Sequence, residues 1–338
     1  MKKKWNLYNI SESRGILMGF ATLIVAFFHC YSFHFTKIFK SQVVGQLFDF
    51  IRKTGNVGVD IFLFLSAIGL YFSFSKNSNI KSFYKKRLLR ILPAVIIVAT
   101  IYYSYLKVKI GVFIQNILLI SLFTRGNRDL WYFSLIIILY FLYPFIHKII
   151  DKKDVKGLLG MLLTIFGLTI LLYNIDYSYY QKIEIALTRI PVFLIGVYVG
   201  KNVYNKKEIP SYLMIINFIV LITSLLLIYK GGYKYYIVVR YLYCLLGISI
   251  VFMISFIHTY LKNKIVDKFL TIIGRYSMEV YLIFEHLCLE VRKVITVNSN
   301  FGFYFIMFIV TLALSFLLSK LCDLIIKLIE GKKEVKAN

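Results

Sequence analysis

The chain has 338 residues, of which 59% are hydrophobic and 17% aromatic, and its formal net charge is +25. So much apolar surface with so few charged residues exceeds what a soluble domain buries and excludes a soluble enzyme. Orientation in a membrane and attraction to anionic head groups explain the positive charge without any nucleic-acid partner. We therefore predict an all-α, polytopic integral protein of the cell membrane.

Apolar runs recur from Gly15 to about Ile326, and a bilayer core needs roughly 20 apolar residues per helix. The run Ile110–Phe123 is too short to span and predicts a half-buried or surface helix. Residues 1–325 are read as one transmembrane domain and 326–338 as a short basic cytoplasmic tail. We predict about ten transmembrane helices, at approximately 15–35, 57–75, 88–106, 130–147, 157–173, 185–200, 212–229, 236–259, 276–291 and 302–322.

The basic residues orient these helices, because short cytoplasmic loops are rich in Lys and Arg. With the amino terminus inside, most of the 41 basic residues fall in inner segments, including "HKIIDKKDVKG". Counting Ile110–Phe123 as a full span would move that loop outside. We therefore predict that both termini are cytoplasmic.

His29 is the first candidate catalytic residue, because a titratable side chain within a membrane is costly and is usually functional. It follows Arg14 by 15 positions, which is roughly 22 Å along a helix. With Arg14 at the cytoplasmic surface, His29 lies in the outer half of the bilayer. The alternative is a structural histidine satisfied by a neighbouring hydroxyl or carbonyl.

Asp60 is the second candidate, near the outer start of the second predicted helix. Because the first helix leaves the membrane where the second enters, Asp60 and His29 are predicted to meet at the same depth. A carboxylate beside an imidazole orients a general base and stabilises its protonated form. The alternative is that Asp60 caps the helix.

Arg87 and Arg90 are three residues apart and share one helix face at the cytoplasmic mouth. Two guanidinium groups placed in this way suit phosphates. The alternative is that both residues only set topology.

Several segments together resemble the membrane acyltransferase-3 family, the integral-membrane O-acyltransferases of glycans. "GFATLIVAFFHC" is similar to its first helix, "GVDIFLFLSAIGLYFS" to its second, and "FYKKRLLRILP" to its Arg-x-x-Arg segment. "LWYFSLIIILYFLYPFI", "RIPVFLIGVYVGK" and "GRYSMEVYLIFEHL" resemble later blocks in the expected order. The resemblance covers about residues 1–325.

The resemblance implies transfer of an acyl group, usually acetyl, from cytoplasmic acyl-CoA to a hydroxyl of a cell-surface glycan or lipid-linked sugar. It implies that His29 is catalytic and that Arg87 and Arg90 hold the CoA end of the donor. Acyl-CoA is then a donor substrate, and neither a permanently bound cofactor nor a metal is expected.

Two positions depart from the family pattern. The Arg-Gly pair of the first helix is Met18-Gly19 here, and Arg14-Gly15 comes one turn earlier, on nearly the same face. The late family histidine is Phe284 here, followed by Glu285 and His286. Arg14 is therefore a candidate donor-binding residue, and either Glu285 or His286 is a candidate replacement.

Arg189 and Glu285 are candidate contacts for the acceptor. Pairing of Arg189 with Asp60 or Glu285, or contact with outer head groups, is the alternative.

Two other functions are compatible with a basic, aromatic and polytopic chain. A glycan transporter or flippase would show matching pairs of Gly- or Pro-broken helices, and no such symmetry is present. A membrane glycan polymerase would carry a substantial polar external loop, whereas the largest external gap, near 107–129, is mostly apolar.

Overall fold

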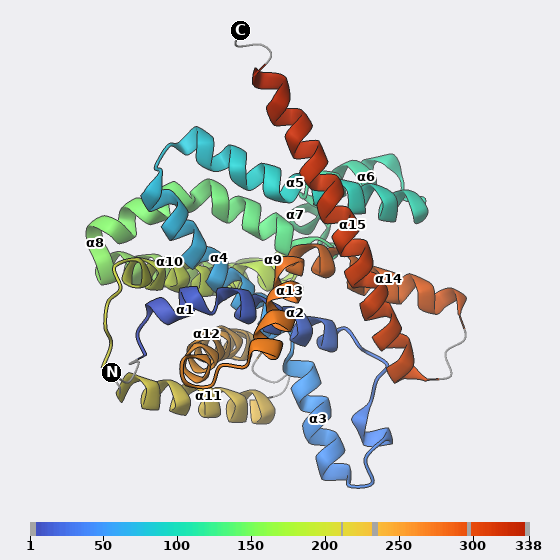
Figure 1. Cartoon of the computed structure of the whole chain (residues 1–338), viewed down its shortest axis with the longest axis horizontal. Coiled ribbons are helices and arrows are strands. Elements are labelled where there is room, and N and C mark those ends of the chain that lie inside the picture. Colours follow the sequence, from blue (N-terminus) through green and yellow to red (C-terminus); the bar gives the residue numbers. More distant parts are fainter. Residues whose placement is uncertain (1–4, 211, 232–235, 296–298, 335–338) are drawn as a thin grey trace.

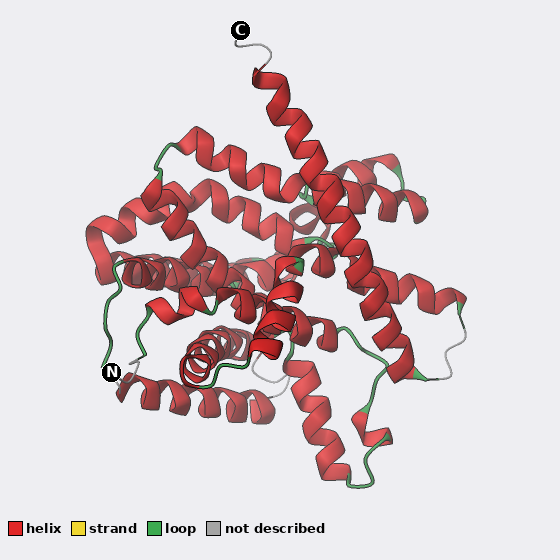
Figure 2. Ribbon diagram, in the orientation of Figure 1, coloured by secondary structure: helices red, strands yellow, loops and turns green. Residues whose placement is uncertain are grey.

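The computed structural model describes residues 5–334, except residues 211, 232–235 and 296–298. Within that part of the chain every regular element is a helix, as Figures 1 and 2 show. An α-helix suits a bilayer, because it satisfies its own backbone hydrogen-bonding groups. The elements are α1 (Tyr8–Glu12), α2 (Arg14–Phe28), η1 (Phe35–Lys37), α3 (Gln42–Thr54), α4 (Val57–Lys76), α5 (Ile80–Tyr105), α6 (Ile110–Ile117), α7 (Ser121–Arg125), α8 (Trp131–Ile175), α9 (Tyr177–Leu187), α10 (Ile190–Tyr204), α11 (Tyr212–Gly231), α12 (Tyr236–Tyr260), α13 (Lys264–Arg275), α14 (Ser277–Val294) and α15 (Asn300–Glu334).

Seven described helical stretches are long and apolar enough to cross a membrane. The predicted polytopic membrane protein is therefore confirmed. Two of the seven stretches join neighbouring helices, α3 with α4 and α9 with α10. α2, with 15 residues, is an apolar helix shorter than the seven. The count of ten spans and the cytoplasmic position of both termini stay predictions.

α4 is the central helix of the bundle. Its most apolar stretch is 78% buried, and α2, α10 and α12 pack against it. Gly196 and Gly200 let α10 approach α4 closely, since an added Cβ would lie 2.8 Å from Phe64 O and 3.1 Å from the Ile68 Cα, respectively. The residues of α4 therefore face protein on nearly every side.

α8 is 45 residues long, but Asp154 breaks it with φ 49° and ψ −129°. The bend lies at the left of Figure 1 and falls within "HKIIDKKDVKG". Lys201 of α10 holds the bend, because its Nζ donates to Asp154 Oδ1 at 3.0 Å. The two arms of α8 correspond to the predicted helices 130–147 and 157–173.

α2 and α13 touch along a line of glycines. A Cβ added to Gly19 would lie 1.9 Å from the Leu270 carbonyl oxygen, and one added to Gly274 would lie 2.4 Å from Gly15 O. Because no side chain separates the backbones, α13 fixes the amino-terminal half of α2.

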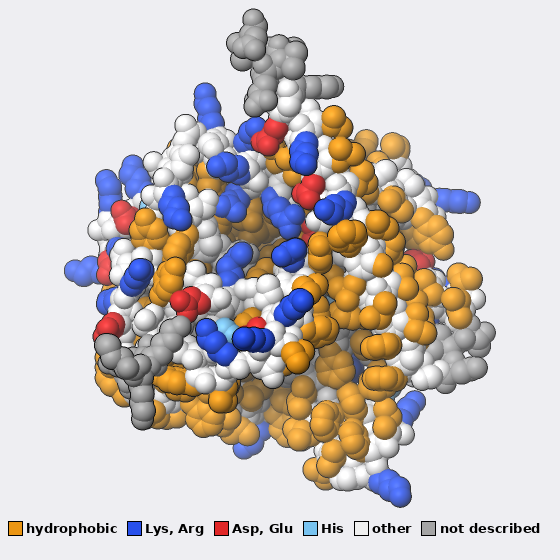
Figure 3. Space-filling view, viewed as in Figure 1, with side chains coloured by type: hydrophobic (Ala, Val, Ile, Leu, Met, Phe, Trp, Pro, Cys, Tyr) orange, Lys and Arg blue, Asp and Glu red, His pale blue; other side chains and the backbone are white. Residues whose placement is uncertain are grey.

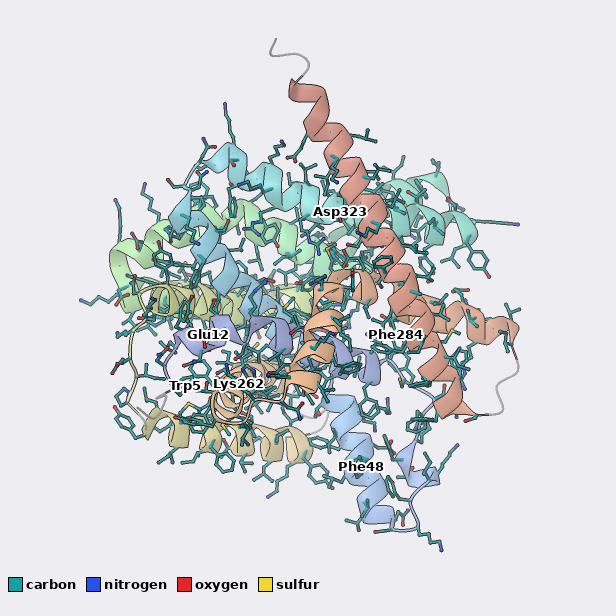
Figure 4. All side chains as sticks on the ribbon, in the orientation of Figure 1. Trp5, Glu12, Phe48, Lys262, Phe284 and Asp323 are labelled. Atoms are coloured by element: carbon teal, nitrogen blue, oxygen red, sulfur yellow. The ribbon has the colours of Figure 1, made fainter. Side chains whose placement is uncertain are left out.

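Three segments differ from, or refine, the sequence expectations. The short run Ile110–Phe123 forms two small helices, α6 and α7. The loop after α2 contains α3, which projects from the bundle and exposes Phe48 (Figures 1 and 4). α15 continues to Glu334, so most of the predicted tail 326–338 is helical, and residues 335–338 lie outside the described residues.

Candidate active site

His29 is the residue that ends α2, and its imidazole meets a carboxylate from a distant helix. Nδ1 of His29 lies 3.2 Å from Oε1 of Glu285 on α14. The side chain of His29 is 14% exposed and that of Glu285 is 34% exposed. An acceptor on Nδ1 favours the tautomer that carries its proton there, which leaves Nε2 as the basic nitrogen.

Tyr31 is the third member of this cluster. Its hydroxyl contacts His29 Nδ1 and donates to Glu285 Oε1 at 2.9 Å. Loss of water around the hydroxyl, and then the neighbouring carboxylate, raise the pKa of Tyr31 above its ordinary value. The hydroxyl therefore keeps its proton and stays a donor to Glu285.

The predicted contact between Asp60 and His29 is wrong, because Asp60 has a different partner. Asp60 is fully buried on α4, and its Oδ1 lies 3.5 Å from Arg189 Nε at the start of α10. Cys244 of α12 also approaches this carboxylate, at 3.6 Å. Counting residues predicted how far along the helix Asp60 lies, but not which side of the helix it occupies. In the structure Asp60 lies on the side of α4 that faces α10 and α12.

Arg189 is enclosed by the protein. Its side chain is 3% exposed, and the guanidinium lies over the Trp131 ring at 4.9 Å. It also donates to the Ile185 carbonyl oxygen at 3.0 Å. Of the alternatives for Arg189, pairing with Asp60 is the arrangement observed. The predicted acceptor contact stays a prediction.

A cavity of about 440 Å³ lies between α2, α4, α5, α8, α13 and α14. Four arginines line it, namely Arg14, Arg87, Arg90 and Arg275. Figure 3 shows a hollow surrounded by Lys and Arg on this face. The cavity thus brings together the three predicted donor-binding arginines and adds one, a concentration of charge that suits a polyanion.

The arginines of this cavity are not equivalent. Arg90 Nη1 lies 3.4 Å from Glu279 Oε1, and the Glu279 side chain is fully buried. The guanidinium of Arg87 lies over the Phe83 ring at 5.6 Å, and its buried Nε has no hydrogen-bond partner among the described residues. Arg90 is therefore held by a carboxylate, whereas Arg87 keeps donors for a ligand.

A chain of polar side chains fixes the start of α2 next to Arg14. Ser13 Oγ lies 3.0 Å from His258 Nδ1, and His258 Nε2 lies 3.1 Å from Asp267 Oδ2. Ser13 is 1% exposed and does not line the cavity, so it is not available as a nucleophile. These hydrogen-bonded side chains instead connect α12 and α13 to Ser13, the residue that precedes Arg14.

A second, much smaller pocket of about 10 Å³ contains His29 and Glu285. Phe62, Ser277 and Tyr281 line both this pocket and the arginine cavity. The two spaces are therefore neighbours, and a ligand held by the arginines has a path towards the imidazole.

A family model described as an acyltransferase domain, Acyl_transf_3, matches residues 16–320. The chain belongs to this acyltransferase family. It is 27% identical over 171 residues to the "Putative acetyltransferase ORF330" of Acidianus two-tailed virus, with 48% of each chain covered. The alignment thus spans about half the length of that relative, and no solved structure matches the acyltransferase.

The late histidine of the family pattern has no direct equivalent in this acyltransferase. Phe284 packs against Phe308 of α15, with ring centroids 5.9 Å apart, where α14 and α15 cross (Figure 4). His286 stacks on Tyr102 of α5 at 4.2 Å and lines an apolar groove outside the small pocket. Between the two candidate replacements, it is Glu285 that reaches His29.

Sequence reasoning missed three residues of the site. Tyr31 follows His29 by two positions but lies beyond the end of the helix, where periodicity gives no direction. Arg275 and Tyr281 fall inside the "GRYSMEVYLIFEHL" block, so the resemblance of that block to the family could have pointed to both residues.

Proposed function

We propose that this acyltransferase moves a short acyl group, acetyl in our assignment, from cytoplasmic acyl-CoA to a hydroxyl of a cell-surface glycan or lipid-linked sugar. The observation that supports this most directly is the shared wall between the arginine cavity and the pocket of His29. A phosphate-rich donor and a basic imidazole require these two environments next to each other.

The donor enters from the cytoplasmic side in this proposal, with ten spans and both termini inside. Arg14, Arg87, Arg90 and Arg275 hold its phosphates through charge-assisted hydrogen bonds. The thioester end of the donor then points from the cavity towards the small pocket of His29. The separation between the arginines and the imidazole suits an extended acyl-CoA, because Arg14 and His29 are the two ends of α2, roughly 22 Å apart.

His29 acts as the general base. Its Nε2 takes the proton of the acceptor hydroxyl while the hydroxyl oxygen attacks the thioester carbonyl carbon. Collapse of the tetrahedral intermediate breaks the carbon–sulfur bond, and the imidazolium returns the proton to the CoA sulfur. Glu285 orients the ring and stabilises the imidazolium, as a carboxylate does beside a catalytic histidine.

A transport function is the alternative from another class, and one experiment separates the two. Membrane vesicles from cells that naturally carry the chain are supplied with acetyl-CoA labelled in the acetyl group, and glycans and lipids are analysed by mass spectrometry. Label in an ester that is absent from vesicles of a deletion strain supports acyl transfer. Glycan movement without label incorporation would reject the enzyme in favour of a flippase.

A further inference from the structure

Glu279 is a buried carboxylate next to the arginine cavity, and the proposed transfer step does not use it. It lies in the first turn of α14, and its side chain is fully buried. Neither carboxylate oxygen has a hydrogen-bond partner within the part of the chain that the structure describes. A buried carboxylate without hydrogen bonds is costly when ionised, so its charge requires a nearby cation. The positive end of the helix supplies only part of that compensation.

Arg90 is the cation that Glu279 faces. Its Nη1 lies 3.4 Å from Glu279 Oε1, and no other described residue forms an ion pair with this carboxylate. The carboxylate of Asp323 on α15, labelled in Figure 4, acts on Glu279 with the same sign of charge and adds no compensation. Glu279 therefore depends on Arg90.

Arg90 also faces the cavity. It lines the cavity wall and its side chain is 48% exposed, whereas Glu279 is not part of the lining. One guanidinium thus lies between a buried anion on one side and the proposed phosphate site on the other. Arg87, three positions earlier on the same helix face, forms no ion pair with a described carboxylate. The two arginines of the pair therefore differ in how freely they can bind a second anion.

We propose that Glu279 competes with the phosphates of the donor for Arg90, and that this competition sets the affinity of the cavity for CoA. The inference rests on the proposed acyl transfer and adds a residue that regulates its donor site. A phosphate that approaches Arg90 brings a second anion to a guanidinium that already compensates a buried carboxylate. Part of the attraction is then lost, because the two anions repel each other and Glu279 has no hydrogen bonds of its own.

The competition acts on free CoA as well as on acyl-CoA, because both molecules carry the same phosphates. Four arginines without a counter-ion would bind the product as tightly as the donor. Glu279 weakens the binding of both, and this favours departure of CoA after transfer. Because the contact is remote from the thioester, the effect belongs to uniform binding and not to the chemical step.

The test measures CoA binding by equilibrium dialysis and donor kinetics in the vesicles described above, with vesicles of the deletion strain as the blank. In Glu279→Gln we expect the Kd for CoA and the KM for acetyl-CoA to fall together by about fivefold, the upper end of what a partly exposed ion pair contributes. The kcat should not rise. The variant should accumulate like the wild type, because Gln keeps the shape of the side chain and removes a buried charge.

Two further variants show whether the gain in affinity depends on Arg90. In an Arg87→Ala background, Glu279→Gln should still tighten CoA binding by about fivefold, since Arg90 is intact. When Arg90→Ala is added to Glu279→Gln, the Kd should return to the wild-type value or exceed it. This double variant replaces both members of the ion pair, so it leaves no buried charge uncompensated.

The matched control is Glu330→Gln, which also removes one negative charge. Glu330 pairs with Lys85, on the same helix as Arg90, at 2.8 Å, and neither residue lines the cavity. Its affinity for CoA should equal that of the wild type. Unchanged or weaker CoA binding in Glu279→Gln would overturn the proposal, and so would a fivefold gain that persists in the double variant with Arg90→Ala. Absence of any acyl transfer by the wild type would instead reject the underlying function.

Discussion

The carboxylate of Glu285 lies 3.2 Å from Nδ1 of His29, which joins α14 to the residue that ends α2. This contact makes the carboxylate, and not Asp60, the partner of the imidazole. We expect His29→Ala to lower kcat by roughly 10²–10⁴-fold, the usual contribution of a general base. The protein should still accumulate in the membrane, as measured by immunoblot, since His29 is at the end of its helix. Activity equal to the wild type would refute the general-base assignment.

Glu285→Gln should lower kcat and leave the KM for acyl-CoA nearly unchanged, because the carboxylate contacts the base and not the arginine cavity. The loss should be smaller than in His29→Ala, and the double variant should be no worse than His29→Ala alone. Steady-state kinetics in vesicles provide the measurement. A rise in donor KM with unchanged kcat would place Glu285 in substrate binding instead.

Asp60→Asn should act on stability. Removing one charge of a buried pair leaves Arg189 uncompensated, which typically costs about 3–5 kcal/mol. We expect reduced membrane accumulation and a lower thermal midpoint, with the kcat of the surviving protein close to that of the wild type. A stable variant with strongly reduced kcat would restore the catalytic role first predicted for Asp60.

Arg87→Ala together with Arg90→Ala should raise the KM for acyl-CoA more than it lowers kcat. Phosphate contacts remote from the thioester contribute mainly uniform binding. Each charge-assisted hydrogen bond is worth roughly 1.5–3 kcal/mol, so an increase in KM of at least tenfold is expected. Lys at both positions should restore only part of the lost affinity for acyl-CoA, because a point charge does not reproduce the guanidinium fork.

The matched control for the arginines is Lys85→Ala, on the same helix. Lys85 pairs with Glu330 on α15 at 2.8 Å and does not line the cavity. Donor KM should not change in this variant. Correct membrane orientation of the arginine variant, checked by accessibility labelling of Lys2–Lys4, with unchanged donor KM would reject the phosphate site.

Gly19→Ala should separate α2 from α13. The new Cβ would lie 1.9 Å from the Leu270 carbonyl oxygen, which belongs to backbone and cannot rotate away. We expect poor accumulation or a raised donor KM, because α13 carries Arg275 and fixes the half of α2 that carries Arg14. Gly160→Ala is the control, since an added Cβ there meets nothing within 4 Å. Equal thermal midpoints for the two variants would contradict the close contact.

The position of a residue along its helix could be predicted approximately from the sequence, but the direction of its side chain around the helix could not. The first helix was predicted at about 15–35 but ends at Phe28, so His29 lies at its end and not within it. Counting residues put Asp60 at a plausible depth, but the glycines of α10 and α12 draw that face of α4 towards Arg189. Tertiary packing decides which way a side chain points around its helix. A single sequence gives only indirect information about that packing.

The arginine pair shows the opposite case. Arg87 and Arg90 were predicted from spacing within one helix, and local geometry alone brings them to one face. Arg275 and Glu285 come from α13 and α14, far along the chain, and meet the first helix only after the bundle closes. Long-range contacts of this kind required the structure.

The shortness of α2 affects the lipid as well as the protein. Its 15 residues extend about 22 Å, whereas the hydrocarbon core of a bilayer is about 30 Å thick. A helix shorter than the core draws the two lipid surfaces together or leaves polar groups below them. In the proposed reaction, bilayer thickness is therefore part of the geometry that brings a hydroxyl from one side to a thioester from the other. Under that proposal, the acyl chains of the host membrane help to set that distance.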